Sequence, residues 1–179
     1  QQMNELTDVV VTYDFSDRKE TVDRSVIKNW LTKDENDDLV LDKAVIANYI
    51  SELAKKYDTV GTERTFSTYD NQEITVSGGN YGWVIDQEKE TDALYQDIMD
   101  KKTEVREPVY EQEAQSRNTN DIGYSYIEID LTRQRMVLYQ NGSPIVDTGF
   151  AASSSTPTGV YRLGDKQEAA SVDFWMPFT

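Results

Sequence analysis

The spacing of apolar residues changes near residue 117, and this change limits the folds that are open to the chain. Before that point, apolar side chains recur every three to four residues in some segments and alternate in others. After it, alternation and turn signals dominate. Helical spacing predicts a helix with one buried face, and alternation predicts a strand. We therefore expect an α+β domain over residues 1–117, a linker at 118–121 and a mostly β domain over 122–179.

Local signals predict the elements of the first domain. The clearest helix has the apolar stripe Val45, Ile46, Tyr49, Ile50, Leu53 and Tyr57, and Asp42 precedes it as an N-cap. A second helix is predicted after the N-cap Asp86, with Leu94, Tyr95, Ile98 and Met99 on its inner face. Between these helices, "RTFSTY" and "EITVSGG" flank "DNQ", which is the pattern of a β-hairpin.

The stretch "SGGNYGW" joins this hairpin to the second helix through a backbone rich in glycine. Gly78 and Gly79 permit positive φ angles or the close approach of another backbone segment. Tyr81 and Trp83 are our candidates for a substrate-stacking surface. Packing of these two rings under the following helix is the alternative interpretation, and we favour it.

Composition excludes several classes of function. The chain has 33 acidic and 18 basic residues, a formal net charge of −15, so we expect no nucleic-acid partner. It contains no cysteine and no histidine, which removes disulfides, thiolate nucleophiles, imidazole bases and most transition-metal sites. We expect no cofactor and no metal. The serines at 153–155 have Lys166 as the nearest base in sequence and no elbow motif, so we interpret them as a polar loop.

Strand and turn signals predict the second domain. "YIEIDL" alternates apolar and acidic residues, "RMVLYQ" follows it, and "SPIVDTGF" returns after Asn141 and Gly142. Asn-Gly between two such segments is the strongest short-range signal for a hairpin. The second domain should therefore be an antiparallel β structure.

These phrases resemble a known family in both halves of the chain. "YIEIDLTRQRMVLYQNGSPIVDTGF", "TPTGVY" and "FWMPF" are similar to the first half of the L,D-transpeptidase catalytic domain, called the YkuD domain. "NWL", "ELAKKYDTVGTERTF", "ITVSGGNYGWVID" and "REPVY" resemble the peptidoglycan-binding domain that precedes it in Gram-positive members. The resemblance covers Val9–Arg117 and Ile122–Thr179. It implies that the second domain is the first half of a YkuD-like β-sandwich.

The resemblance implies peptidoglycan cross-linking by cysteine acyl transfer. In the family, a thiolate attacks a tetrapeptide stem, D-Ala leaves, and an amine of a neighbouring stem resolves the thioester into a 3→3 cross-link. The histidine and the Ser-His-Gly-Cys motif that this chemistry uses are absent, and we expect that the chain ends before them. We predict an L,D-transpeptidase as the parent protein and no activity in this chain alone. A non-catalytic peptidoglycan-binding protein and a structural spacer are the alternatives.

The resemblance also implies partners and a location. Peptidoglycan stem peptides should bind, carbapenems should inhibit the complete enzyme, and the parent protein should be membrane-anchored on the extracellular face of the cell envelope. Trp175, Met176 and Phe178 lie in a segment that is near the substrate groove in the family, so they are further candidates for substrate binding. A buried edge strand capped by Pro177 is the alternative interpretation. An incomplete β domain leaves open strand edges, for which we expect self-association.

Overall fold

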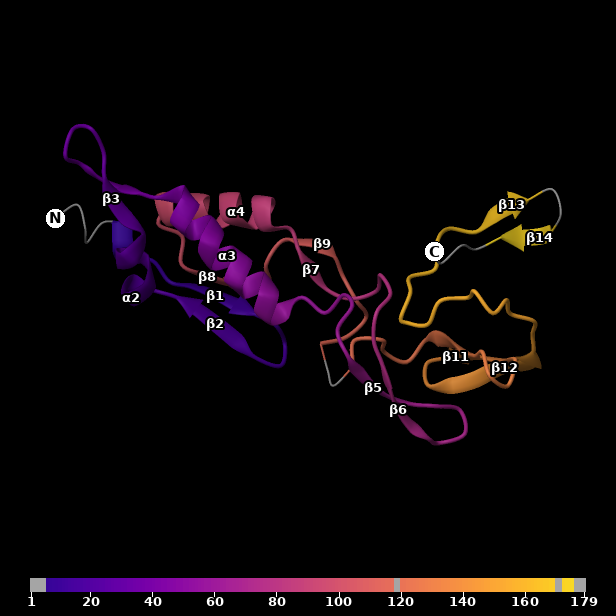
Figure 1. Cartoon of the computed structure of the whole chain (residues 1–179). Coiled ribbons are helices and arrows are strands. Elements are labelled where there is room, and N and C mark those ends of the chain that lie inside the picture. The colour runs from indigo at the N-terminus through magenta and orange to yellow at the C-terminus, as the bar shows by residue number, and fades with distance from the viewer. Residues whose placement is uncertain (1–5, 118–119, 170–171, 176–179) are drawn as a thin grey trace. The chain divides into compact units, whose positions relative to one another are not determined.

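The computed structural model describes residues 6–117, 120–169 and 172–175, and Figure 1 traces the chain. The chain forms two compact units, and each unit combines two separate stretches of the sequence. The first comprises residues 1–58 and 83–113, and the second comprises 59–82 and 114–179. The domain boundaries at 117 and 122 stay a prediction. The contacts place residues 59–82 with the C-terminal unit.

The first unit has the mixed α+β structure that the sequence predicts. Its helices are α2 (Arg24–Ile27), a 3-10 turn (Lys28–Trp30), α3 (Lys43–Tyr57) and α4 (Gln87–Met99). Its strands are β1 (Val11–Asp14), β2 (Lys19–Val22), β3 (Leu31–Lys33), β4 (Leu39–Leu41), β7 (Val84–Ile85), β8 (Glu104–Arg106) and β9 (Tyr110–Gln112). Strand β1 pairs antiparallel with β2 and parallel with β8, while β3 pairs with β4 and β7 pairs with β9.

The two main helices begin where the sequence predicts. The Asp42 carboxylate accepts a hydrogen bond from the backbone amide of Ala44, and the Asp86 carboxylate accepts one from the backbone amide of Lys89. Each satisfies a backbone donor that the first helical turn leaves free. The inner faces of α3 and α4 share one hydrophobic core with β1, whose fully buried members include Ile46, Ile50, Leu94, Ile98, Val11 and Tyr13.

One prediction for α4 is wrong. Met99, expected on the inner face, is 45% exposed at the last position of the helix. Glu90 and Asp97 take inner positions with Leu94 and Ile98 instead. Their burial is tolerated because Arg106 from β8 pairs with both carboxylates. A hydrophobic pattern cannot reveal this, because it assigns every acidic residue to the outer face.

The second unit is mostly β structure. Its strands are β5 (Arg64–Ser67), β6 (Glu73–Val76), β10 (Tyr126–Asp130), β11 (Arg135–Gln140), β12 (Ser143–Gly149), β13 (Gln167–Ala169) and β14 (Val172–Trp175). Strands β10, β11 and β12 form an antiparallel sheet in that order, and β5–β6 and β13–β14 are antiparallel pairs. Asn141 and Gly142 both have positive φ between β11 and β12, as the Asn-Gly signal predicts. The antiparallel β class is confirmed.

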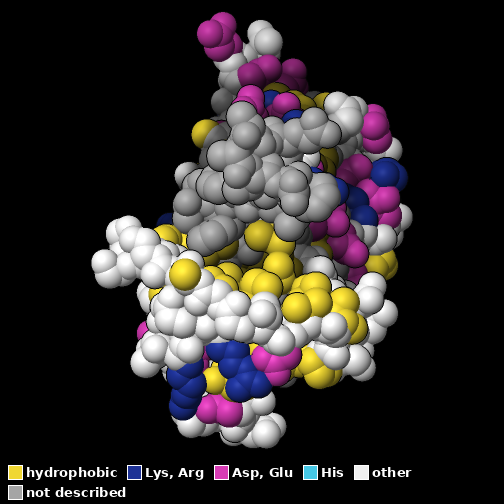
Figure 2. Space-filling model, turned by 90° about the vertical axis from the view of Figure 1, so that its right-hand side faces the viewer, with side chains coloured by type: hydrophobic (Ala, Val, Ile, Leu, Met, Phe, Trp, Pro, Cys, Tyr) yellow, Lys and Arg dark blue, Asp and Glu magenta, His cyan; other side chains and the backbone are white. Residues whose placement is uncertain are grey.

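Burial in the β10–β11–β12 sheet does not follow the alternation of apolar and acidic residues in the sequence. Glu128, on the face predicted to be polar, is only 9% exposed, whereas Ile129 on the other face is 39% exposed. Ile145 and Val146 of β12 are also exposed. Figure 2, in which the right-hand side of Figure 1 faces the viewer, shows apolar side chains at the surface.

In the described part of the chain, no helix is long and apolar enough to cross a bilayer.

Candidate functional site

Tyr81 and Trp83, the predicted stacking residues, make packing contacts. Trp83 is 7% exposed, and its ring lies 4.8 Å from that of Tyr110 in the first unit. The half-buried Tyr81 hydroxyl, in the second unit, donates to the carbonyl oxygen of Asp121 and accepts from the amide of Gln115. Burial raises the pKa of the Tyr81 phenol. These contacts favour the packing interpretation, and a role in substrate binding stays a prediction.

The other predicted site residues lie at the end of the chain. Met176 and Phe178 lie outside the described residues. Trp175 is the last residue of β14, where it pairs through its backbone with Gln167 of β13. The prediction that these three residues bind substrate therefore stays open.

The glycines of "SGGNYGW" are explained by a close approach of two backbone segments. Gly79 has a φ of +87°, and a Cβ atom added to it would lie 1.9 Å from the carbonyl oxygen of Val160. Gly79 and Val160 form a parallel β-bridge. The Val160 amide donates to the carbonyl oxygen of Gly78, and the Tyr81 amide donates to that of Val160, each at 3.1 Å. The predicted close approach and positive φ angles are confirmed.

A buried ion pair lies next to this segment and binds the carbonyl oxygen of Tyr81. Arg64 and Asp121 are 4% and 5% exposed, and two nitrogens of the Arg64 guanidinium contact the two carboxylate oxygens at 2.5 and 2.9 Å. The remaining guanidinium contacts are to the carbonyl oxygens of Thr59, Thr62 and Tyr81. The Thr59 hydroxyl also donates to Asp121. The buried charges are therefore paired and hydrogen-bonded, as burial of an ion pair requires.

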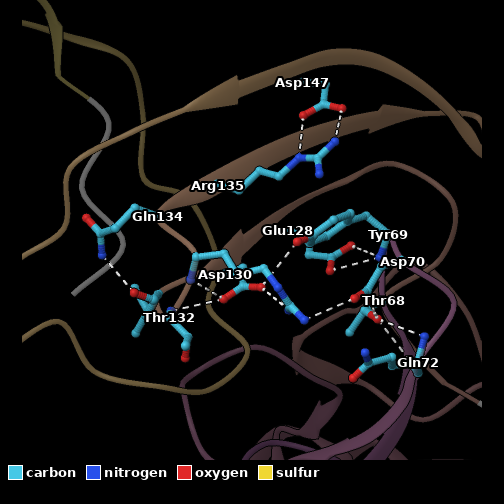
Figure 3. A network of polar contacts seen from close by, with 12 residues as sticks. Thr68, Tyr69, Asp70, Gln72, Glu128, Asp130, Thr132, Gln134, Arg135 and Asp147 are labelled. Atoms are coloured by element: carbon cyan, nitrogen blue, oxygen red, sulfur yellow. Dashed lines mark hydrogen bonds and ion pairs between the residues drawn. The ribbon is translucent and has the colours of Figure 1, made fainter.

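A second buried carboxylate binds the tip of the β5–β6 hairpin, as Figure 3 shows. Both oxygens of Glu128 accept from the amide of Tyr69, at 3.0 and 2.9 Å. Burial raises the pKa of Glu128, the Tyr69 amide opposes this rise, and the nearby carboxylates of Asp70 and Asp130 add to it. The polar face of β10 is thus a docking surface for the hairpin, which explains why Glu128 is buried.

Two arginines complete the network around the hairpin tip. Arg133 pairs with Asp130 at 2.8 Å and with Asp70 at 3.4 Å. Arg135 forms a bidentate pair with Asp147, and its guanidinium carbon lies 4.4 Å from the centre of the Tyr69 ring. The arginine-carboxylate geometry and the cation-π contact both fix the orientation of Arg135. The network therefore has the character of a structural anchor.

Sequence reasoning missed these anchors. The partners in the two buried contacts are 57 and 59 residues apart, so no local spacing links them. Among the described residues there is no cluster of three potential metal ligands. The hydroxyls of Ser153 and Ser155 lie 2.8 Å apart and hydrogen-bond each other. The described residues thus provide anchoring and packing contacts, and the sequence provides no cysteine or histidine for acyl transfer.

The raised pKa of Glu128 gives a pH-dependent contribution to stability. The folded protein holds this proton more tightly than an unfolded chain, in which the pKa is about 4.5. The contribution of Glu128 is therefore most favourable below that pH and is lost as the pH rises through the raised pKa. The stability of the wild type relative to Glu128→Gln should fall from about pH 4.5 toward neutral pH.

Denaturant unfolding of both proteins over this pH range measures the difference. Glu73→Gln, on an exposed residue of the same hairpin, controls for removal of one negative charge. A wild-type advantage that grows with pH would contradict the assignment.

Comparison with known proteins gives matches for both halves of the chain. The family model described as "Putative peptidoglycan binding domain" matches residues 1–106, and the one described as "L,D-transpeptidase catalytic domain" matches residues 124–177. No curated protein matches the chain.

Two solved structures resemble the whole chain. One is a cysteine-to-serine mutant of the Enterococcus faecium L,D-transpeptidase, with 28% identity and a TM-score of 0.75 over 99% of this chain and 77% of that one. The other, the Ldtfm-avibactam carbamoyl enzyme, has the same identity and TM-score over 99% of this chain and 75% of that one. The first family model alone matches more than half of the sequence, and the second follows it in order. The chain therefore belongs to the family described as "Putative peptidoglycan binding domain", and this domain is followed by residues that match the L,D-transpeptidase catalytic domain.

Proposed function

We propose that the protein carrying this chain is a peptidoglycan L,D-transpeptidase that forms 3→3 cross-links by cysteine acyl transfer. The main support is the likeness to an L,D-transpeptidase over 99% of the chain at 28% identity. This likeness runs through both domains, so it concerns more than a shared fold. The Ldtfm-avibactam carbamoyl enzyme, one of the similar solved structures, supports covalent chemistry in the family.

The proposed reaction has two acyl-transfer steps. A cysteine thiolate attacks the carbonyl carbon between the third residue and D-Ala of a tetrapeptide stem. The carbon-sulfur bond forms, the amide carbon-nitrogen bond breaks, and D-Ala leaves with the proton that the base took from the thiol. An amine of a second stem then gives a proton to the base and attacks the thioester, an amide forms, the carbon-sulfur bond breaks, and the thiolate is released. We assign the nucleophile and its base to the parent protein, because these 179 residues contain no cysteine and no histidine.

The N-terminal domain would place the catalytic domain on the cell wall. This role follows from the match to a peptidoglycan-binding family over residues 1–106. Peptidoglycan stem peptides would be the physiological partner, and carbapenems would acylate the complete enzyme. We propose that the parent protein acts at the extracellular face of the cell envelope and is membrane-anchored there.

Release of D-Ala tests the proposed reaction. A disaccharide tetrapeptide incubated with the parent protein should lose D-Ala and give a 3→3 cross-linked dimer in the mass spectrum. The present chain should give neither product, and a Cys→Ala variant of the parent protein should lose both. Absence of both products with the parent protein would contradict the enzyme proposal.

A non-catalytic peptidoglycan-binding protein is the second candidate, favoured by the lack of cysteine and histidine in this sequence. Both candidates include binding to the wall, so binding to purified sacculi does not separate them. D-Ala release by the parent protein does separate them. If sacculi are bound and no D-Ala is released, the second candidate is correct.

We also propose that this chain self-associates. Within the described residues, β12 pairs with β11 on one side, and all seven of its residues are exposed, including Ile145 and Val146. An open strand edge with exposed apolar residues favours pairing with another chain. Light scattering should show a mass that increases with concentration. A stable monomer at high concentration would contradict this prediction.

A further inference from the structure

Residues 59–82 form a segment that we call the strap. The family model for peptidoglycan binding covers it in sequence, because that match extends over residues 1–106. The structure places the strap in the compact unit that contains the residues matched by the catalytic-domain model, 124–177. Sequence similarity and three-dimensional contacts therefore assign this segment to different modules.

Three groups of contacts anchor the strap at separate points. The buried pair between Arg64 and Asp121 holds its base. Its middle packs through the ring of Phe66, which lies 5.5 Å from that of Tyr126 in an edge-on arrangement. The hydrogen bonds from the Tyr69 amide to the Glu128 carboxylate, described above, hold the tip. The strap is therefore a fixed part of the second unit.

The end of the strap holds a segment that has little regular structure. Residues 150–166 contain no helix or strand apart from the bridge at Val160. Besides the backbone pairing of Gly78–Tyr81 with Val160, the amide of Arg162 donates to the side-chain oxygen of Asn80 at 2.9 Å. The residues that follow Arg162 lead directly into β13. A shift at Val160 would therefore move the start of the next strand pair.

We propose that the strap is a positioning element of the catalytic domain. It contributes to turnover and not to wall binding, and Gly79 determines the position of residues 156–162. The proposal rests on the transpeptidase function proposed above. The residue that controls the position is a glycine because any Cβ at Gly79 would occupy the space of the Val160 carbonyl group. Val160 could accommodate it only by moving away from the strap.

Gly78 provides a matched control for this proposal. Its φ of +82° is close to the +87° of Gly79, so alanine is conformationally strained to a similar degree at both positions. A Cβ at Gly78 would meet nothing within 4 Å. Comparison of Gly79→Ala with Gly78→Ala therefore separates the contact with Val160 from the strain of the backbone.

Hydrogen exchange in the present chain tests the position of the segment. Gly79→Ala should speed exchange of the Val160, Tyr81 and Arg162 amides by about tenfold relative to Gly78→Ala. If Gly79→Ala does not fold, Asn80→Ala against Asn80→Asp provides a second pair, because only aspartate keeps an acceptor for the Arg162 amide. In that pair, faster exchange of Arg162 is expected for alanine alone. Equal exchange within the pair that is measured would overturn the proposal.

Turnover in the parent protein tests the function of the strap. Gly79→Ala should lower kcat for D-Ala release by about tenfold or more relative to Gly78→Ala, while binding to purified sacculi stays unchanged. Reduced sacculus binding with unchanged kcat would overturn the proposal, since the strap would then serve the wall-binding module. If the wild-type parent protein releases no D-Ala, the proposed transpeptidase function fails, whereas the exchange result still decides the position of the segment.

Discussion

Replacing Arg64 with alanine should lower the free energy of unfolding of the second unit by about 3–5 kcal/mol. Asp121, at 5% exposure, would lose the guanidinium that pairs with both of its carboxylate oxygens, while the Thr59 hydroxyl would still donate to it. The carbonyl oxygens of Thr59, Thr62 and Tyr81 would also lose a hydrogen-bond donor. An uncompensated buried charge is among the most destabilising changes that one substitution can make.

Urea unfolding followed by a probe in the second unit measures this effect. The control in the same unit is Arg162→Ala, which removes an exposed cation and should change stability by less than about 0.5 kcal/mol. Replacing both Arg64 and Asp121 with apolar residues of similar size should recover much of the loss, because no charge then remains buried. A loss of less than about 1 kcal/mol for Arg64→Ala would contradict the structural assignment.

Replacing Glu90 with alanine should have an effect of similar size, about 3–5 kcal/mol, in the first unit. The Glu90 side chain is fully buried, and it accepts hydrogen bonds from the Tyr13 hydroxyl, the Arg106 guanidinium and the Val109 amide at 2.5 to 2.9 Å. Removal of the carboxylate leaves a buried hydroxyl and a backbone amide without an acceptor. Burial and the neighbouring Glu90 charge raise the pKa of Tyr13, so this hydroxyl stays protonated and needs a partner.

Thermal or denaturant unfolding of Glu90→Ala tests this prediction. Glu88→Ala is the matched control, because Glu88 also lies in the first turn of α4 but is exposed. Both substitutions remove one negative charge near the helix N-terminus, where such a charge stabilises the helix by about 0.3–1 kcal/mol. Only Glu90→Ala breaks the buried network. Similar losses for the two variants would show that the network contributes little.

The sequence predicts the elements that depend on local signals. The helix α3, its N-cap Asp42 and the turn at Asn141–Gly142 all follow from residues within a few positions of each other. These are confirmed because capping and turn conformation are determined by short stretches of backbone. The glycines at 78 and 79 also signalled a close approach, although the sequence does not identify Val160 as the partner.

The buried ionic contacts could not be predicted in this way. Glu128 alternates with isoleucines and so is expected to face solvent, yet the hairpin tip covers it. Arg64 and Asp121 are far apart in the sequence, and each is an ordinary charged residue in its local context. Their burial depends on which segments meet in the folded chain. For the same reason, the assignment of residues 59–82 to the second unit came only from the structure.

The family could be identified from the sequence, but the reacting groups could not be located in it. The motif "TPTGVY" and its order relative to "SGGNYGWVID" carry the resemblance, and the family matches agree with it. Trp83, a candidate stacking residue for which we favoured packing, packs against Tyr110, and its role in substrate binding stays a prediction. A resemblance names a domain, whereas a contact residue has to be found from geometry.

Intact-protein mass spectrometry with a carbapenem tests the central claim most directly. The claim is that acyl transfer depends on a cysteine that the parent protein supplies and these 179 residues lack. The parent protein should gain the mass of one carbapenem, a Cys→Ala variant should not, and the present chain should show no adduct because it has no thiol. A carbapenem adduct on the present chain, or none on the parent protein, would contradict the claim.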